Sequence, residues 1–173
     1  MLVVIIELKS QMIYLWIVVC PATATTIKFD DISIGAVPSG YNNLVWTNGN
    51  AITTTAGNGY YTGAVSRPNS VMNPYGDPMT IASANSQSFT LYSLVIAAAW
   101  YDDLQLTVVG YKSNIVIATS TFTFQVFTAS YLSFSGFSGL DKVIFTTSGG
   151  TKNSVVTGNG THFSMDNICL TFT

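Results

Sequence analysis

The chain has 173 residues, a length that suits a single domain with an ordinary buried core. Charged residues make up only 8% of it, against about 25% in a typical domain, and the formal net charge is −2. Lys and Arg form no cluster, which argues against a nucleic-acid partner because such binding depends on basic side chains at the phosphates. The many aromatic and β-branched residues argue against disorder.

The first 24 residues have the pattern of an export signal. An apolar run, Met12–Val19, follows Lys9 and precedes Ala-Thr-Ala at 22–24, which matches the A-x-A cleavage pattern. We therefore predict that residues 1–24 form a signal peptide and that the secreted mature domain spans 25–173, without a membrane span. A membrane anchor is the alternative, although Glu7 and Lys9 interrupt the ~20 apolar residues that a spanning helix needs.

Short apolar runs separated by Gly, Asn and Ser indicate strands along the rest of the chain. In the longest pattern, Phe89–Tyr111, an apolar run is followed by Asp102 and Asp103 and then by Leu104, Leu106 and Val108 in alternation with polar residues. Period-two alternation marks a half-buried strand, so we predict a central hairpin that turns at the Asp pair. Further strands are predicted at Ile27–Ile34, Leu44–Trp46, Ala51–Thr55, Tyr60–Ser66, Met79–Ala82, Ile115–Phe127, Tyr131–Phe134, Leu140–Thr147 and His162–Phe172.

Four segments carry a resemblance to a known fold. FDDI at 29–32, AAWYDDLQLTVVGY at 98–111, FSGLDKVIFTTSGG at 137–150 and FSMDNICL at 163–170 resemble secreted jelly-roll domains. Such domains occur in extracellular bacterial surface proteins and in carbohydrate-binding modules. The resemblance covers Ile27–Thr173 and implies an all-β, jelly-roll-type antiparallel β-sandwich, here of about nine strands, a secreted location and often a structural calcium. A fold alone does not give a function.

The residues argue against catalysis. The predicted mature chain has no Glu and a single His, His162. A glycosidase needs two carboxyl groups about 5–9 Å apart across a cleft, but Asp30 and Asp31 are neighbours on one predicted strand and would face opposite sides. His162 and Cys169 would lie about 23 Å apart on one strand, too far for a nucleophile–base pair. The G-x-S-x-G and H-E-x-x-H motifs are absent. We predict that the protein is not an enzyme.

A calcium site is predicted from the resemblance and from three oxygen-bearing residues. Asp31 falls in the first predicted strand, and Asp166 and Asn167 fall in the last, and the first and last strands of jelly rolls are commonly neighbours. Calcium takes six to eight oxygen ligands, so these residues and backbone carbonyls could hold a structural Ca²⁺. The alternative is that the Asp side chains end strands or accept hydrogen bonds from backbone amides.

The two cysteines are predicted to be separated by processing. Cys20 would leave with the signal peptide, and a lipidated Cys20 is disfavoured because the bulky Val19 precedes it. Cys169 then lies alone in an alternating strand, where a cysteine is most often a small buried hydrophobic residue. An intermolecular disulfide is the alternative.

A sugar site is predicted where aromatic side chains meet polar ones at the ends of strands. The predicted ligand-binding residues are Trp100, Tyr101, Asp102, Tyr60, Tyr61 and Trp46. The alternative is that these aromatic residues pack in the core or on the sheet, and Trp46 in particular could be the central core tryptophan. Asn159-Gly160-Thr161 is an N-x-T acceptor sequence in a Gly-rich loop and predicts glycosylation of Asn159 in a eukaryotic source.

The sequence thus predicts a secreted, non-catalytic β-sandwich module whose leading function is to bind an extracellular glycan. The rival is a structural subunit of an extracellular fibre, coat or adhesive surface that assembles by β-strand addition between subunits. The low charge, the many Ser, Thr and Asn residues and exposed sheet edges favour such self-assembly.

Overall fold

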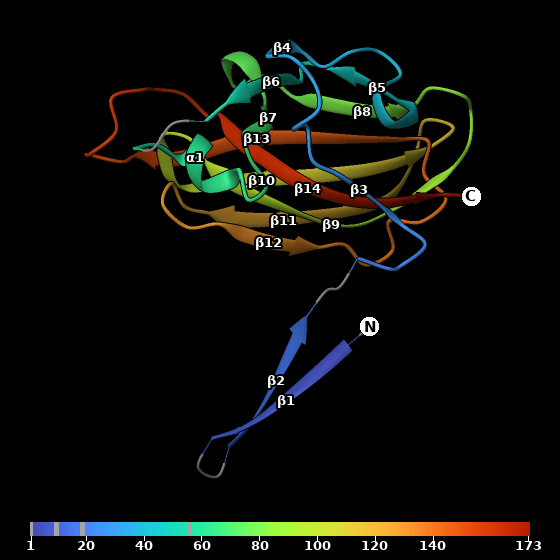
Figure 1. Cartoon of the computed structure of the whole chain (residues 1–173), viewed down its shortest axis with the longest axis horizontal. Coiled ribbons are helices and arrows are strands. Elements are labelled where there is room, and N and C mark those ends of the chain that lie inside the picture. Colours follow the sequence, from blue (N-terminus) through green and yellow to red (C-terminus); the bar gives the residue numbers. More distant parts are fainter. Residues whose placement is uncertain (1, 9–10, 18–19, 55–56) are drawn as a thin grey trace.

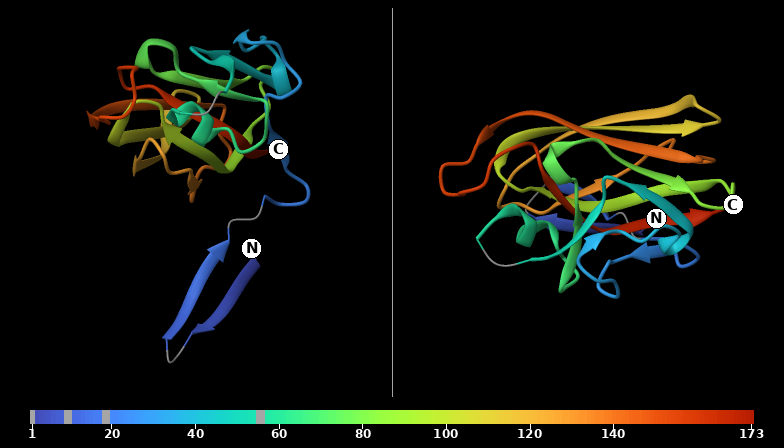
Figure 2. Two further views of the ribbon diagram at one scale, coloured as in Figure 1. Left: turned by 60° about the vertical axis from the view of Figure 1, so that its left-hand side comes forward. Right: turned by 90° about the horizontal axis from the view of Figure 1, so that it is seen from above.

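The structure is a computed structural model that describes residues 2–8, 11–17, 20–54 and 57–173. Two antiparallel sheets pack face to face, as Figures 1 and 2 show. The first sheet runs in the order β11 (Ile115–Phe124), β10 (Tyr101–Lys112), β13 (Lys142–Lys152), β8 (Met79–Ser83) and β5 (Leu44–Thr47). The all-β sandwich predicted from the sequence is confirmed.

The second sheet has seven strands. Its order is β12 (Ser130–Ser133), β9 (Phe89–Ala98), β14 (Phe163–Phe172), β7 (Asn69–Met72), β6 (Asn50–Thr53) and β4 (Gly35–Ala36), and β3 (Thr25–Ile27) also pairs with β14. The sandwich therefore has sheets of five and seven strands, where the sequence predicted about nine strands in all. One of the additional strands, β4, has only two residues, too few to show a period in the sequence.

A hairpin of β1 (Leu2–Leu8) and β2 (Gln11–Ile17) precedes the sandwich (Figure 1). Lys9, Val18 and Val19 of the predicted signal peptide and Thr55 of a predicted strand lie outside the described residues. No helix among the described residues is long and apolar enough to cross a membrane.

The predicted central hairpin is wrong, although both of its strands exist. β9 pairs with β12 and β14, whereas β10 pairs with β11 and β13 in the other sheet. The chain crosses between the sheets at Ala99 and Trp100, and Asp102 and Asp103 lie inside β10 rather than in a turn. The apolar residues of β9 and β10 face the same core from opposite sheets. Two strands of a hairpin would show the same pattern of apolar residues, so the sequence does not distinguish the two arrangements.

The core lies between the sheets and is rich in aromatic side chains. Leu104, Leu106 and Val108 on β10 are fully buried, as their alternation predicted. The largest fully buried side chains include Phe29, Phe89, Phe124, Phe137, Phe145 and Phe163. β14 is buried on both faces from Phe163 to Asp166, and a short helix and the loop around Ser66 pack on it.

The predicted strand Tyr60–Ser66 is wrong. Gly59–Gly63 forms the short helix α1, and the next strand begins only at Asn69. Asn58 caps this helix, since its side-chain oxygen accepts a hydrogen bond from the Tyr61 amide at 3.3 Å. A Cβ atom on Gly59 would lie 1.5 Å from the Ala98 carbonyl oxygen, and one on Gly63 would lie 2.5 Å from that of Ser164. Both glycines are therefore required for the helix to pack closely on β9 and β14.

The first predicted strand is also shorter than expected. Only Thr25–Ile27 forms a strand, and Phe29, with φ of +64°, begins a turn that contains Asp30 and Asp31. Its pairing with β14, Ile168 to Ile27, confirms that the first strand of the sandwich lies beside the last.

The prediction that Cys169 is unpaired is wrong. Its Sγ atom is bonded to that of Cys20, and the two Cα atoms lie 5.7 Å apart. The backbone between Cys20 and Thr25 stays close to β14, and the Thr171 hydroxyl donates to the Thr23 carbonyl at 3.5 Å. A mature chain that begins after Ala24 would lack this disulfide. A cleavage site before Cys20 is therefore an alternative to the predicted site after Ala24.

Candidate functional site

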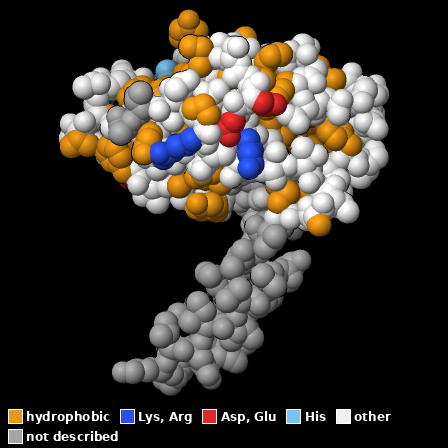
Figure 3. All heavy atoms as spheres, viewed as in Figure 1, with side chains coloured by type: hydrophobic (Ala, Val, Ile, Leu, Met, Phe, Trp, Pro, Cys, Tyr) orange, Lys and Arg blue, Asp and Glu red, His pale blue; other side chains and the backbone are white. Residues whose placement is uncertain are grey.

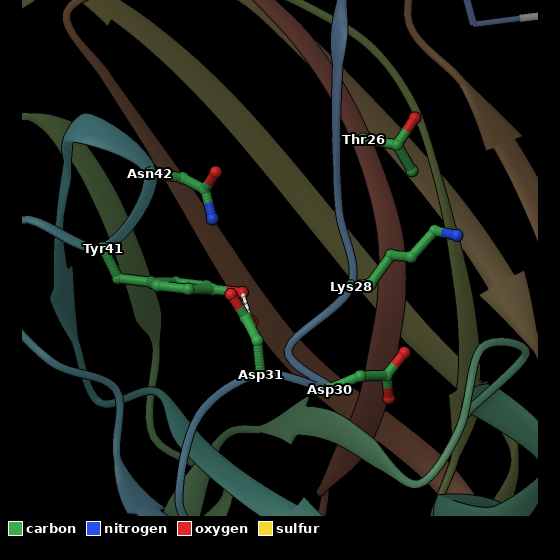
Figure 4. A pocket seen from close by; sticks show the side chains of 6 residues that line it. All are labelled: Thr26, Lys28, Asp30, Asp31, Tyr41 and Asn42. Carbon is green, nitrogen blue, oxygen red and sulfur yellow. Dashed lines mark hydrogen bonds between the residues drawn. The ribbon is translucent and has the colours of Figure 1, made fainter.

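A shallow polar groove of about 260 Å³ lies beside β3 on the outer face of the seven-stranded sheet. We call it the Tyr41 groove; its lining residues are Thr26, Lys28, Asp30, Asp31, Tyr41 and Asn42. Figure 4 shows the side chains of Asp31 and Tyr41 pointing toward each other, while those of Lys28 and Asp30 project to the other side. In Figure 3 acidic and basic side chains lie together on this face, amid a mostly uncharged surface.

Tyr41 forms the aromatic wall of the groove. The 3-10 helix η1 (Tyr41–Asn43) carries it, between Gly40 and Asn42, which both have positive φ angles of +85° and +53°. Its hydroxyl donates to Asp31 Oδ1 at 2.6 Å, and its ring contacts that of Phe29 at a centroid distance of 5.8 Å. Burial, together with the hydrogen bond and the charge of Asp31, raises the pKa of Tyr41 to about 12. Tyr41 is therefore a neutral donor that holds the Asp31 carboxylate in place.

Asp30 is fixed by the backbone on the opposite side of the turn. Its Oδ1 atom accepts a hydrogen bond from the Asn69 amide at 3.0 Å. The Asn69 side chain, which is buried, in turn donates to the carbonyls of Phe29 and Ile32, at 3.3 and 2.9 Å. These bonds stabilise the turn in a conformation that presents two adjacent carboxylates and the exposed Lys28 to solvent.

Asp166 lies on β14, near Asp30, and is fully buried. Its carboxylate accepts hydrogen bonds from the Ser66 amide at 2.7 Å, from the Ser66 hydroxyl at 3.0 and 3.1 Å, and from the Asn167 amide at 2.7 Å. Burial raises the pKa of Asp166 to about 6, and the charge of Asp30 adds to this, while the hydrogen bonds oppose it. Asp166 thus ties the loop around Ser66 to the sheet.

The predicted calcium ligands do not fit a metal site as they stand. Asp31 accepts from Tyr41, and both oxygens of Asp166 face N–H and O–H donors, which a cation would have to displace. Asn167 Oδ1 is buried without a hydrogen-bond partner, but no group of three His, Cys, Asp or Glu residues among the described residues could hold an ion. Calcium stays a prediction, and a melting temperature lowered by EDTA would support it.

Most of the predicted sugar-binding residues surround α1 and the loop that precedes β14. We call Tyr60, Trp100, Tyr101, Asp102 and His162 the Trp100 cluster. Tyr60 packs edge-to-face on Trp100 with ring centroids 5.1 Å apart, and its hydroxyl oxygen lies 2.6 Å from His162 Nδ1. A Cβ atom on Gly158 would lie 2.4 Å from carbons of the Trp100 indole, so the loop covers one face of this ring.

The polar groups of the Trp100 cluster are engaged by the fold. The Tyr101 hydroxyl donates to Asn159 Oδ1 at 2.6 Å, which places the predicted glycosylation residue in this loop. Asp102 accepts from the Val126 amide at 3.1 Å and from Asn153 Nδ2 at 2.6 Å. The structure therefore brings Trp100, Tyr60, Tyr101 and Asp102 together. However, Tyr101 and Asp102 are already hydrogen-bonded within the protein, and the Gly158 loop covers one face of Trp100.

Tyr61 and Trp46 lie apart from this cluster. The Arg67 guanidinium stacks 3.7 Å above the Tyr61 ring centroid and also donates to its hydroxyl. Trp46 is only 9% exposed and packs edge-to-face on Phe29. It is therefore a core tryptophan, which was the alternative to a sugar-binding role. Its indole N–H donates to the Tyr41 carbonyl at 3.1 Å and so supports the Tyr41 groove from beneath.

Four residues of the groove were not predicted from the sequence: Tyr41, Asn42, Lys28 and Thr26. A signal was present in Gly40-Tyr41-Asn42-Asn43, because Gly and Asn tolerate positive φ and favour a tight turn that can project an aromatic side chain. The positive φ of Phe29 had no comparable signal, since bulky residues rarely adopt it.

Comparison with protein-family models gives no match, and comparison with curated proteins gives none. Among solved structures, a DUF4465 family protein from Bacteroides caccae is similar over 88% of this chain and 88% of its own, with a TM-score of 0.57 and 12% identity. At this identity the likeness shows the fold alone, and it confirms at that level the predicted resemblance to jelly-roll sandwiches.

Two further structures are more distant. The K2 adhesin domain of Lys-gingipain has a TM-score of 0.48 and 10% identity, over 87% of this chain and 99% of that one. The carbohydrate-binding module CBM29-2 has a TM-score of 0.43 and 12% identity, over 86% of this chain and 91% of that one. Neither likeness is close enough to carry a function over to this chain.

Proposed function

We propose that this β-sandwich module is secreted, has no catalytic role and binds an extracellular glycan in the Tyr41 groove. The observation that carries the proposal is the fixed Tyr41 ring, flanked by the acceptors Asp30 and Asp31 and by the donors Lys28 and Asn42. Sugar hydroxyls both donate and accept hydrogen bonds, and sugar C–H faces pack on aromatic rings. A groove that offers all three contacts suits a sugar better than an apolar or singly charged ligand.

The shape of the groove agrees with a sugar chain. A volume of about 260 Å³ lies just below the ~300–1,000 Å³ typical of closed small-molecule pockets, and the groove is shallow. One or two rings of a longer chain can therefore rest on it while the rest of the chain extends past it. Such sites give weak affinity for each ring and gain strength when several modules act on one polymer.

Two observations support a secreted, non-catalytic protein. The Cys20–Cys169 disulfide is typical of oxidising compartments, and disulfides are rare in the cytosol. Asp30 and Asp31 are neighbours in one turn, and Figure 4 shows their side chains directed apart rather than across a shared bond. This arrangement suits two separate acceptors and not an acid–base pair.

A glycan array probed with the parent protein and with Tyr41→Ala tests the proposal. Tyr75, on the 3-10 helix η2 (Pro74–Gly76), offers a matched control because it is 88% exposed and does not line the groove. We expect the parent and Tyr75→Ala to bind the same glycans and Tyr41→Ala to lose them while remaining folded by circular dichroism. A parent protein without array binding, or an unchanged Tyr41→Ala, would overturn the proposal.

A further inference from the structure

β11 is the long open edge of the five-stranded sheet. It pairs with β10 from Leu104–Phe124 to Lys112–Ile115, with one shift of register at Ile117, and no strand among the described residues pairs with its other side. One row of backbone N–H and C=O groups therefore faces away from the sheet over a strand of ten residues. Such a row is a template for another strand.

Charged residues and prolines, which often protect an edge strand, are missing from this one. From Ser113 to Leu140 the sequence has no Asp, Glu, Lys, Arg, His or Pro. Ile115, Val116 and Ile117 are 66%, 54% and 47% exposed at the start of β11. The strand has one irregularity, at Ile117, and its pairing with β10 is regular from Ala118 to Phe124. Natural edge strands commonly carry charges or prolines that prevent pairing, so an uncovered edge with neither indicates a partner.

More exposed apolar residues lie on the same side of the molecule. Phe127 follows β11, and Tyr131 is on β12, the edge strand of the other sheet; both are large and exposed. Figure 1 shows β11 and β12 lying next to each other along one side of the sandwich. The other edge of the five-stranded sheet, β5, has only four residues. The features that favour pairing are thus concentrated on the β11 side.

We propose that β11 pairs antiparallel with β11 of a second copy of this chain, which joins the two five-stranded sheets into one continuous sheet. Antiparallel pairing of a strand with itself has two-fold symmetry and is therefore self-complementary. Two copies that each carry a net charge of −2 repel each other least where neither presents a charge, and β11 is such a place. Its Thr and β-branched residues also form favourable cross-strand pairs.

The unpaired backbone row explains why the occupant is a strand and not a glycan. A sugar would contact side chains, whereas main-chain donors and acceptors at regular spacing are matched by another β-strand. The Tyr41 groove is formed by residues 26–42, none of which belongs to β11, so the two surfaces can be occupied independently.

Sedimentation velocity of the purified full protein, from micromolar to millimolar concentration, tests the proposal. Ile117→Lys places like charges in the paired edges, and Val45→Lys is its matched control because Val45 is an exposed apolar residue on β5, the opposite edge of the same sheet. We expect the parent to form a dimer, Ile117→Lys to raise the dissociation constant about tenfold or more, and Val45→Lys to leave it unchanged.

Hydrogen exchange locates the contact within the protein. The β11 amides should gain protection as the parent concentration rises, while those of β5 should not, and Ile117→Lys should abolish the gain without changing the melting temperature of the monomer. A parent that stays monomeric overturns the proposal and leaves the edge to a different partner. A dimer that both substitutions weaken equally, or that only Val45→Lys weakens, overturns it as well.

Discussion

The Tyr41 groove and the Trp100 cluster contain the same kinds of residue but use them differently. Each has aromatic rings beside carboxylates and amides. In the Trp100 cluster, Asp102 accepts from Asn153 and Val126, and Gly158 covers one face of the indole. In the groove, Asp31 accepts from Tyr41, and Lys28 and Asn42 stand beside it around an open volume. An aromatic–acid pattern in a sequence therefore indicates a site only where the fold leaves the polar groups available.

We expect the largest effect on stability from loss of the Cys20–Cys169 disulfide, which lies beside the Tyr41 groove. Thr26 lines the groove, and its hydroxyl donates to Cys20 Sγ at 3.3 Å, so the Cys20–Cys169 bond secures one groove wall. The bond closes a loop with a sequence separation of 149, and loss of such a cross-link costs about 5 kcal/mol in the chain-entropy account. We expect Cys20→Ser to lower the unfolding free energy by that order in chemical denaturation.

This variant and the mass of the exported protein together distinguish a cleavage site before Cys20 from one after Ala24. Cys20 is partly exposed, so the serine changes little apart from the cross-link. The intact mass of the exported protein should include Cys20 and should rise by about two hydrogen masses on reduction. An exported chain that begins near Thr25, together with an unchanged stability of Cys20→Ser, would instead support the predicted boundary after Ala24.

Truncation of Trp100 is expected to have the next largest effect. Because this ring packs between Tyr60 and the Gly158 loop, Trp100→Ala should cost about 3 kcal/mol of stability and leave glycan binding by the folded protein intact. Gly158→Ala should cost ~1–3 kcal/mol through overpacking against the indole, and much less in the Trp100→Ala background. If Trp100→Ala instead kept its stability and lost array binding, the sugar site would lie in the Trp100 cluster.

The two regions should also respond to pH with opposite signs. Burial lowers the pKa of His162 in the Trp100 cluster below 6.5, so its contribution to stability is present above pH 6.5 and is lost as the pH falls. The pKa of Asp166 near the groove is raised from 3.8 to about 6, so its contribution is present below pH 3.8 and is lost as the pH rises through 6.

Variants at these two positions separate the contributions. Relative to Asp166→Asn, the parent should lose roughly 2 kcal/mol of stability between pH 4 and pH 6, because the shift spans about two pKa units. Relative to His162→Gln, the parent should instead gain stability as the pH rises toward neutrality. Urea unfolding at each pH measures both differences, and parallel profiles for parent and variant would contradict the corresponding assignment.

The elements predicted correctly are those whose signal is local. The alternation of Leu104, Leu106 and Val108 identified β10, and the closing segment identified β14, because a strand with a buried face has a period of two wherever it lies. The partners of a strand are set by contacts far along the chain. The sequence therefore placed β9 and β10 in one hairpin, whereas each belongs to a different sheet.

The candidate site was harder to predict because it depends on departures from local rules. Asp30 and Asp31 were placed on one predicted strand, which would have directed them to opposite faces. The turn at Phe29, a bulky residue with positive φ, is instead held by the side chain of Asn69, which lies 40 residues away in sequence. The Cys20–Cys169 disulfide is incompatible with the predicted cleavage after Ala24, which would remove Cys20, and the partner of Cys169 lies 149 residues away in sequence.

The smallest expected effect is that of Tyr41→Phe, which tests what the hydroxyl adds to the ring. The substitution keeps the aromatic surface and removes the donor that holds Asp31 at 2.6 Å. The pair is exposed, so its loss should change stability by less than about 1 kcal/mol. Glycan affinity should fall several-fold, since Asp31 then has to be ordered when the sugar binds. Calorimetric titration with an array-identified glycan measures this, and Tyr75→Phe is the matched control. A Tyr41→Phe variant that loses binding as completely as Tyr41→Ala would show that the hydroxyl contacts the sugar itself, and one that binds like the parent would show that Asp31 takes no part.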